Sequence, residues 1–353
     1  HRKNFGDADA GAVVVMDVKT GEILAMVSYP DYDPAVFLGD DNEAKAAILT
    51  QEGNPMWNRA SQEIYAPGST YKPLVAVAAL ESGTITPTTL INCPYREEVG
   101  GLMLTNLEGN QGKIALTKAL ATSSNMFFYK VGVMTGIDNI VKWAKEFGLA
   151  QPTGIEITES VGRIASREFK KTYFGEDWYP ANTVMAAIGQ LYNAFTPVQI
   201  TNYISCIANE GKRYTPHLIK MAVSPEGKIV YEAPDEYYKI PVKQDTIDAV
   251  KAGMVAVTHR NDGTAASVFR DFPFDVAGKT GTSETGREAT ESSNGLFVCY
   301  APYDDPQIAI AVVVEHGVWG SWTAPIAKDI MMAYFRLNET EDTSGSHTVE
   351  IIW

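Results

Sequence analysis

Apolar residues along this chain form strand-like runs near both ends and helix-like segments between them. Two early runs, at 12–16 and 23–27, flank a short polar segment that contains Thr20 and Gly21. Apolar, β-branched runs on either side of a Thr-Gly turn predict a β-hairpin within 11–28. Both runs are nearly continuous rather than alternating, so the sheet that they join is predicted to be covered on both faces. Three later strands are predicted at 275–281, 296–300 and 308–315.

The middle of the chain carries helical patterns. Apolar spacing and helix stop signals predict helices at 73–80, 118–132, 137–147, 184–209 (interrupted near Pro197) and 244–257. A small hairpin is predicted around 224–227, and a closing helix at 324–337. The polar residues after 337 predict a loose tail at 338–353.

Two early strands and three late strands, separated by a helical block, favour one sheet built from both ends of the chain. We therefore predict an α/β (α+β) fold with a mixed five-stranded sheet. The sheet layer comes from 11–28 and 275–337, and a large, mainly helical insertion occupies 58–260. The whole of 1–353 is predicted to form a single domain.

Charge and hydropathy exclude several classes of function. The chain has 353 residues, and 29 basic against 43 acidic residues give a formal net charge of −14. This balance argues against nucleic-acid binding and against attachment to anionic lipid through basic residues. No run of about 18 apolar residues occurs, so no membrane span or membrane contact is expected. The chain begins at His1 without a signal-peptide pattern, and we expect a fragment of a longer protein whose anchor lies outside it.

Common catalytic and metal-binding motifs are missing from the sequence. There is no HExxH, GxxxxGK[ST] or GxSxG, and no GxGxxG after a strand. Cys93, Cys206 and Cys299 are too few for a disulfide framework and are expected to be small core residues, although one bridge between two of them stays open. The five histidines form no short-spaced cluster, so neither a metal nor another cofactor is expected. Nothing supports a Ser-His-Asp triad.

The one SxxK segment, at 69–72, stands where an apolar helix begins. Residues three apart on a helix share a face, so the Ser69 hydroxyl and the Lys72 amine point the same way. Pro73 is tolerated in the first turn, and Gly68 lets the chain turn sharply into the helix. A lysine packed among apolar neighbours can lose its proton near neutral pH and act as a base. Taken alone, the pattern favours an N-capping serine with a surface lysine one turn on over a catalytic pair.

A second candidate element is Ser123 followed by Asn125, a hydroxyl and an amide two residues apart. Such a pair can relay a proton through Ser123 while Asn125 binds a peptide group of a substrate. A rival SxN stands at 292–294, and a polar turn explains either one.

The third candidate element is 279–282, which follows a predicted strand and reads Lys-Thr-Gly-Thr. Gly281 would let a substrate backbone approach the strand edge closely. Lys279, Thr280 and Thr282 offer a cation and two hydroxyls to a carboxylate. A rival Lys-Thr-Gly at 19–21 lies in the predicted hairpin turn, where Thr and Gly serve the turn geometry.

The three motifs together are far more specific than any one of them. SxxK, SxN and KTG[ST] form the signature set of penicillin-binding proteins and serine β-lactamases, and the positions 69, 123 and 279 have the order of that family. The chain resembles the transpeptidase domain of class B penicillin-binding proteins, most closely those of the cell-elongation type. The resemblance extends from about residue 11 to residue 335 and includes segments at 58–60, 65–69, 147–149, 152–154, 188–190, 196–197, 263–265, 279–284 and 324–327.

This resemblance implies a fold like that of penicillin-binding proteins and serine β-lactamases, with a mainly antiparallel sheet that has helices on both faces. It implies that Ser69 attacks the D-Ala-D-Ala bond of a peptidoglycan stem peptide, forms an acyl-enzyme and releases D-Ala. An acceptor amine would then resolve the acyl-enzyme and cross-link the wall. Lys72 would take the Ser69 proton, Ser123 would relay it towards the leaving amine, and Asn125 would hold the donor peptide. β-Lactam antibiotics would acylate Ser69 as substrate mimics.

The resemblance also implies roles for the residues of the KTGT segment at 279–282. Lys279, Thr280 and Thr282, with Gly281 between them, would bind the terminal carboxylate of the donor peptide. The backbone N–H groups of Ser69 and Thr282 would form the oxyanion hole.

Some positions depart from the family pattern. Leu191 stands where a glycine is usual, and Gly295 and Leu296 stand where a small residue and an aromatic residue often occur. Between Cys93 and Ser123 there is no histidine and no second cysteine, so the metal site of some elongation-type relatives is not expected.

Other functions remain open at this point. A D,D-carboxypeptidase would use water in place of the acceptor amine with the same acylating residues. A β-lactamase would need a further group to activate the deacylating water, and none is evident beside the motifs. The domain could also be a β-lactam sensor or an inactive scaffold. For the cross-linking enzyme we expect a location at the outer face of the bacterial cytoplasmic membrane, with glycosyltransferase partners bound through segments outside this chain.

Overall fold

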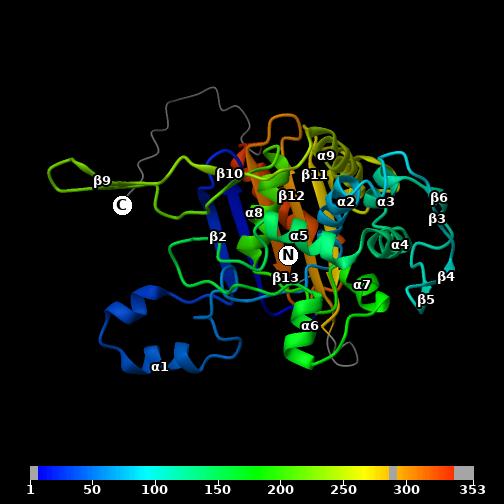
Figure 1. Cartoon of the computed structure of the whole chain (residues 1–353). Coiled ribbons are helices and arrows are strands. Elements are labelled where there is room, and N and C mark those ends of the chain that lie inside the picture. The colour runs from blue at the N-terminus through cyan, green and yellow to red at the C-terminus, as the bar shows by residue number, and fades with distance from the viewer. Residues whose placement is uncertain (1–6, 286–291, 338–353) are drawn as a thin grey trace.

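The computed structural model describes residues 7–285 and 292–337, and its central sheet joins the two ends of the chain (Figure 1). The strand order is β11-β12-β13-β1-β2, and every pairing among these strands is antiparallel. The strands are β1 (Gly11–Asp17), β2 (Ile23–Tyr29), β11 (Ala277–Ser283), β12 (Asn294–Ala301) and β13 (Ile308–Val314). The predicted five-stranded sheet is confirmed, with two strands from 11–28 and three from 275–337. The prediction that the sheet is mixed is wrong, because all its strand pairs are antiparallel. The predicted tail at 338–353 lies outside the described residues.

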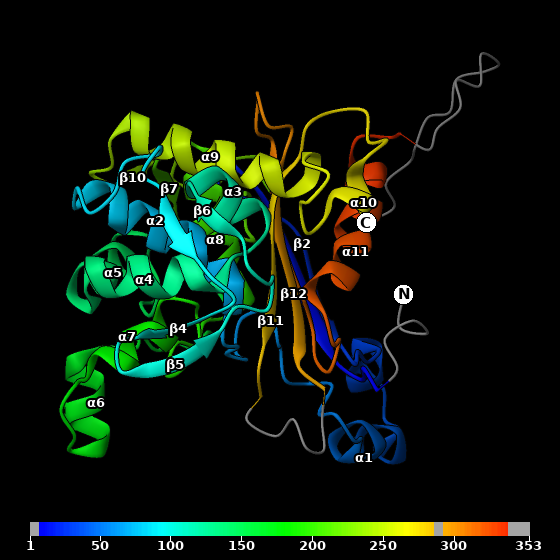
Figure 2. The same ribbon diagram turned by 90° about the vertical axis from the view of Figure 1, so that its right-hand side faces the viewer.

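The inner strands are apolar on both faces because each face supports its own hydrophobic core. Along β12, Leu296 and Val298 pack into the core on the side of the helical region, while Phe297 and Cys299 pack into a second core under α11 (Gly320–Tyr334). Successive side chains of a strand point to opposite faces, so two cores require an unbroken apolar run. Figure 2 shows α11 and the short helix α10 (Ala266–Phe269) on one side of the sheet and the helices of the insertion on the other.

The edge strand β2 departs from this pattern. Its residues alternate irregularly between half-buried and exposed, and Leu24 and Val27 are among the exposed apolar side chains. The prediction of a sheet covered on both faces is therefore correct for β1 and wrong for β2. Within the described residues both β2 and β11 are edge strands, yet β11 is almost wholly buried, so edge position alone does not expose β2. The apolar run of β2 does not show how far other elements cover its faces.

The insertion contains the predicted helices together with small two-stranded sheets. The hairpin predicted around 224–227 is one of these sheets and is confirmed, whereas the apolar pattern does not predict the others. Its helical elements are η3 (Gly68–Tyr71), α2 (Lys72–Glu81), α3 (Leu116–Ala121), α4 (Asn125–Thr135), α5 (Ile137–Glu146), α6 (Arg167–Phe174), α7 (Pro180–Ala186), α8 (Pro197–Ala208) and α9 (Gln244–His259). The small sheets pair β3 (Ile91–Cys93) with β6 (Gly112–Ile114), β4 (Arg96–Val99) with β5 (Leu102–Thr105), β7 (Lys212–Tyr214) with β10 (Tyr237–Lys239), and β8 (Met221–Val223) with β9 (Ile229–Glu232). Outside the insertion lie η2 (Pro34–Leu38), α1 (Asn42–Thr50) and α10 (Ala266–Phe269). None of the helices in 7–285 and 292–337 is long and apolar enough to cross a bilayer.

Two predicted helices are interrupted. The segment 118–132 is divided between α3 and α4, because Ser123 adopts a positive φ of 58° and the Ser124 hydroxyl caps α4 by accepting a bond from the Phe127 N–H (3.3 Å). The segment 184–209 is divided between α7 and α8 by a loop at 187–196, which confirms the interruption predicted near Pro197. Both interruptions border the cleft described below.

Leu191, where the family usually has glycine, lies in that loop with a positive φ of 67°. A residue with a Cβ is disfavoured there by about 1–2 kcal/mol. Its partly buried side chain packs against a small cluster of Ile137, Ala165 and Ala186. At Leu191 the strained backbone therefore lowers the stability of the fold, while the packing of the side chain raises it.

We predict that Leu191→Gly is more stable than Leu191→Ala by about 1 kcal/mol, although both lose the packing of the leucine. Alanine keeps the strained conformation, whereas glycine relieves it. Chemical denaturation of both variants measures the difference. Equal stabilities, or a more stable alanine variant, would contradict a strained backbone at this position.

Candidate active site

A cleft of about 600 Å³ opens beside the exposed edge of β11. Its walls come from the start of η3, the turn between α3 and α4, the β5–β6 loop, the loop after α7 and the N-terminus of α11. Its lining includes Ser69, Thr122, Ser123, Asn125, Gln190, Thr264, Thr280, Thr282, Trp319 and Gly320. The cleft thus gathers segments that are far apart in the sequence.

Ser69 lies in η3, where three backbone segments approach one another closely. The Gly68 N–H donates to the carbonyl of Gly189 (3.1 Å), and a Cβ added to Gly68 would lie 2.5 Å from the carbonyl oxygen of Thr282. Glycine at 68, with a φ of 51°, lets β11 and the Gly189 loop meet directly beside the serine. Ser69 itself is half-buried and lines the cleft.

Lys72, the first residue of α2, is fully buried. Its Nζ lies 2.6 Å from the carbonyl oxygen of Ser123, 3.3 Å from the Ser123 Oγ and 2.6 Å from the Oδ1 of Asn125. Burial lowers the pKa of Lys72 to about 7, and the negative charge of Glu108 partly opposes that shift. Near pH 7 a large fraction of this amine is neutral and able to accept a proton. Within the described residues, no hydrogen bond joins it to the Ser69 hydroxyl.

Lys279 is the second buried amine of the site. Its Nζ donates to the Ser123 Oγ (2.7 Å) and to the carbonyl of Thr280 (2.9 Å). Burial, and then the neighbouring charge of Lys72, lower the pKa of Lys279 well below its usual value. The Ser123 hydroxyl therefore lies between two amines.

The remaining predicted residues follow β11. The hydroxyls of Thr280 and Thr264 lie 2.7 Å apart, and the Thr282 Oγ1 accepts a bond from the Gly320 N–H (3.3 Å). At Gly281, an added Cβ would lie 2.8 Å from the Cγ2 of Thr70. All eight residues predicted from the three motifs come together: five line the cleft, Lys72 and Lys279 lie buried, and Gly281 lies in β11.

Sequence reasoning did not single out several residues of the cleft. Thr264 and Gln190 stand in segments that contributed to the family resemblance, and Gln190 donates from its Nε2 to the carbonyl of Thr282 (3.4 Å). Glu108 and Glu284 also line the cleft. Glu284 ends the 279–284 segment of the family resemblance, whereas no local pattern marks Glu108, which reaches the cleft from the separate β5–β6 loop.

The two rival motifs lie in different places. Lys19 is in the turn between β1 and β2 and pairs with Asp305 (2.7 Å), as the turn interpretation expects. Ser293 lines the cleft, while Asn294 begins β12. The second SxN is therefore near the site, but Lys72 and Lys279 contact Ser123.

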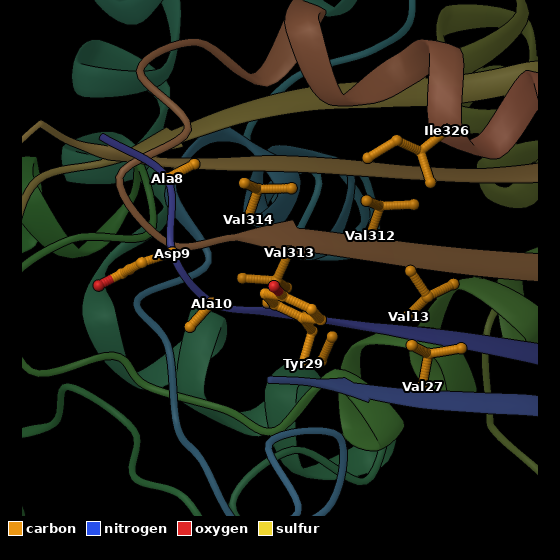
Figure 3. Close-up of a pocket in the computed structure, with 12 residues that line it drawn as sticks. Ala8, Asp9, Ala10, Val13, Val27, Tyr29, Val312, Val313, Val314 and Ile326 are labelled. Atoms are coloured by element: carbon orange, nitrogen blue, oxygen red, sulfur yellow. The ribbon is translucent and has the colours of Figure 1, made fainter. Parts of the chain in front are cut away.

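Outside the cleft, three features of the described residues bear on further chemistry: an apolar hollow, the potential metal ligands and the cysteines. An apolar hollow of about 220 Å³ lies between β1, β2, β13 and α11 (Figure 3), where Val13, Val27, Val312 and Ile326 face one another. Among the residues that the structure describes, no three His, Cys, Asp or Glu side chains form a group that could hold a metal ion. Cys93, Cys206 and Cys299 are buried and free.

The penicillin-binding protein transpeptidase domain model matches residues 11–332. The chain belongs to this family. It is 36% identical over 359 residues to the peptidoglycan D,D-transpeptidase MrdA of Haemophilus influenzae, covering 94% of this chain and 54% of that protein. It is 34% identical to MrdA of Escherichia coli K12, covering 91% of this chain and 53% of that protein. The chain thus spans about half the length of the curated relatives that it matches.

Solved structures agree with this assignment. PBP2 of Pseudomonas aeruginosa in complex with WCK 5153 is 32% identical with a TM-score of 0.84, covering 99% of this chain and 78% of that chain. PBP2 of Helicobacter pylori in complex with MreC is 31% identical with a TM-score of 0.83, and the match covers 95% of this chain and 61% of that chain. A ceftriaxone acyl-enzyme complex of penicillin-binding protein A from Mycobacterium tuberculosis is 27% identical with a TM-score of 0.80, and the match covers 92% of this chain and 73% of that chain.

The contact of Gly189 with Gly68 gives a prediction. A Cβ added to Gly189 would lie 2.1 Å from the Gly68 carbonyl oxygen, whereas one added to Gly227 would meet nothing within 4 Å. The φ values, 76° and 79°, are nearly equal. We expect Gly227→Ala to lose about 1 kcal/mol of folding free energy and Gly189→Ala about 1–3 kcal/mol more. Chemical denaturation measures the folding free energy of both variants. Equal losses in the two variants would show that the loop at Gly189 moves away from an added methyl group at no cost in folding free energy.

Proposed function

We propose that this chain is the transpeptidase domain of a cell-wall cross-linking enzyme and that Ser69 is its nucleophile. The observation that carries the proposal is the accessible Ser69 hydroxyl, on the same cleft as two buried amines and the edge of β11. The names of the relatives, peptidoglycan D,D-transpeptidase, support the reaction class. The acyl-enzyme complex of a neighbouring structure supports a covalent intermediate.

In the proposed reaction, the Ser69 Oγ forms a bond to the carbonyl carbon of the penultimate D-Ala while its proton passes to the neutral amine of Lys72. The C–N bond to the terminal D-Ala then breaks, and the proton moves from Lys72 through Ser123 to the leaving amine. An acceptor amine attacks the resulting ester and restores the Ser69 hydroxyl. Catalytic hydrogen bonds often form only in the substrate complex, so the absence of a resting Ser69–Lys72 bond is compatible with this path.

The strand β11 would bind the donor peptide. Among the described residues no strand pairs with its outer edge, so an extended peptide can add to it by main-chain hydrogen bonds. Lys279, Thr280 and Thr282 would hold the terminal carboxylate, and Asn125 would bind a peptide amide. The backbone N–H groups of Ser69 and Thr282 would stabilise the oxyanion, a role worth about 3–4 kcal/mol for one donor in comparable enzymes.

We also propose a setting for the domain. The MreC complex of a neighbouring PBP2 and a neighbouring structure of a peptidoglycan synthase complex support assembly with other wall-synthesis proteins. Such an enzyme would act at the outer face of the bacterial cytoplasmic membrane, and its partners would include a glycosyltransferase. Residues 1–353 would contribute one transpeptidase domain to a longer protein.

Replacing Ser69 by alanine should abolish covalent labelling by benzylpenicillin and leave the fold intact. The matched control is Ser293→Ala, which removes a hydroxyl from the same cleft and should leave labelling unchanged. Intact-mass spectrometry after incubation detects the adduct. Labelling that persists without Ser69 would rule out the assigned nucleophile.

The acylation rate should depend on the protonation of Lys72. Below pH 7 the amine gains a proton and cannot act as a base, so the rate should fall about tenfold per pH unit; above pH 7 it should level off. The second-order rate constant for acylation by benzylpenicillin, measured from about pH 5 to pH 9, tests this expectation. A flat profile would exclude Lys72 as the base.

The fate of the acyl group on Ser69 distinguishes a transpeptidase from a β-lactamase and from a D,D-carboxypeptidase. A stable drug adduct on Ser69 is expected for a penicillin-binding protein, whereas rapid loss of the adduct with consumption of the drug would indicate a β-lactamase. With a stem-peptide substrate and an added amine, formation of the cross-linked product is expected. Release of D-Ala with water as the sole acceptor would instead favour a D,D-carboxypeptidase.

A further inference from the structure

The backbone at Ser123 is held in an unfavourable conformation. Its φ of 58° is left-handed, and the hydroxyl it presents lies between the amines of Lys72 and Lys279. A residue other than glycine pays about 1–2 kcal/mol for this conformation, which persists only where the surroundings enforce it. The turn supplies two backbone bonds of its own, from the Ser123 N–H to the Leu120 carbonyl (3.2 Å) and from the Ser124 N–H to the Ala119 carbonyl (2.9 Å). Contacts from outside the turn add to them.

The side chain of Gln111, in the loop between β5 and β6, contacts both neighbours of Ser123. Its Nε2 donates to the Thr122 Oγ1 (3.0 Å), and its Oε1 accepts from the Ser124 Oγ (2.5 Å). One carboxamide thus bridges the residues before and after Ser123, the left-handed residue of the turn.

The directions of these bonds are fixed by the other partners of the two hydroxyls. Thr122 donates its hydrogen to the carbonyl of Lys118 (2.9 Å), so it can only accept from residue 111. The Ser124 Oγ accepts from the Phe127 N–H (3.3 Å), so its own hydrogen is available for Gln111. The site at 111 therefore needs a donor and an acceptor in one side chain, which a carboxamide supplies.

Gln111 is itself held in place. Its N–H donates to the carbonyl of Cys93 (3.0 Å), and its Oε1 also lies 3.3 Å from the Nδ2 of the fully buried Asn106. The same Nδ2 donates to the carbonyl of Gly109 (2.6 Å), which closes the loop that carries Glu108 into the cleft. The network joins this wall of the cleft to the turn at Ser123.

We propose that Gln111 is a positioning residue that fixes the left-handed turn at Ser123 and so aims the Ser123 hydroxyl between the two amines. This inference rests on the proposed function, in which Ser123 relays a proton during acylation. Gln111 does not line the cleft in this structure, so its effect on the reaction would pass through Ser123.

The test is the acylation of Ser69 by benzylpenicillin in Gln111→Met, which keeps the length of the side chain and removes both hydrogen bonds. We expect the limiting acylation rate at saturating drug to fall roughly 10-fold to 100-fold, because a misplacement of about 1 Å is this costly in an active site. The half-saturating drug concentration should stay nearly unchanged. Asn110→Ala is the matched control: Asn110 bonds the Gly112 N–H in the same loop (3.1 Å), and its loss should alter the rate less than about twofold.

A double-mutant cycle with Ser123→Ala separates an effect on the position of the Ser123 hydroxyl from a general loss of order in the cleft. If Gln111 acts through Ser123, Gln111→Met should cause little further loss in the Ser123→Ala background. Equal losses in both backgrounds, or an unchanged rate in Gln111→Met, would overturn the inference. Should Gln111→Met fail to fold, Thr122→Val removes one of the two contacts and should slow acylation in the same Ser123-dependent way. An unlabelled parent protein would instead refute the proposed function.

Discussion

The chemistry of this site depends on removing two lysine amines from water. Lys72 and Lys279 are both fully buried, and their mutual repulsion adds to the cost of charging Lys279. Desolvation brings the pKa of Lys72 to about 7, into the range where an amine can exchange a proton at neutral pH. An exposed lysine at the same distance from Ser123 would stay protonated and could only donate. The rest of the cleft serves to keep these amines dry while Ser69 stays accessible.

The fold meets both requirements by letting backbone segments approach one another directly. Gly68 and Gly189 bring η3 and the loop after α7 together, and β11 passes beside them. Without side chains in these gaps, the wall around Ser69 consists of backbone groups in fixed positions. Backbone N–H groups are well suited to stabilise an oxyanion, since they cost no side-chain ordering during the reaction. The two hydrophobic cores behind β12 hold this wall rigid from both faces of the sheet.

The sequence was most informative where chemistry demands residue types in a fixed order. Ser69, Lys72, Ser123, Asn125 and the 279–282 segment could be found because three weak motifs share one family order, and the strands followed from apolar runs. Local patterns could not reveal the interruption at Ser123, because the Gln111 contacts that accompany it come from a separate loop. Thr264 stands in a segment of the family resemblance, but its bond to Thr280 could not be predicted because the two residues come from separate segments. The exposure of β2 depends on how far other elements cover its faces, which its apolar pattern does not encode.

The unfavourable features of the molecule therefore concentrate around one hydroxyl. The left-handed backbone of Ser123 and the two desolvated amines beside it each lower the stability of the folded state. They are tolerated because every polar atom among them has a partner: Lys72 bonds Asn125, and Lys279 bonds Thr280. Removing one partner would leave a buried polar group unsatisfied, which costs more than the bond itself contributes. The network therefore behaves as a unit, and its geometry is stricter than the strength of any single contact would suggest.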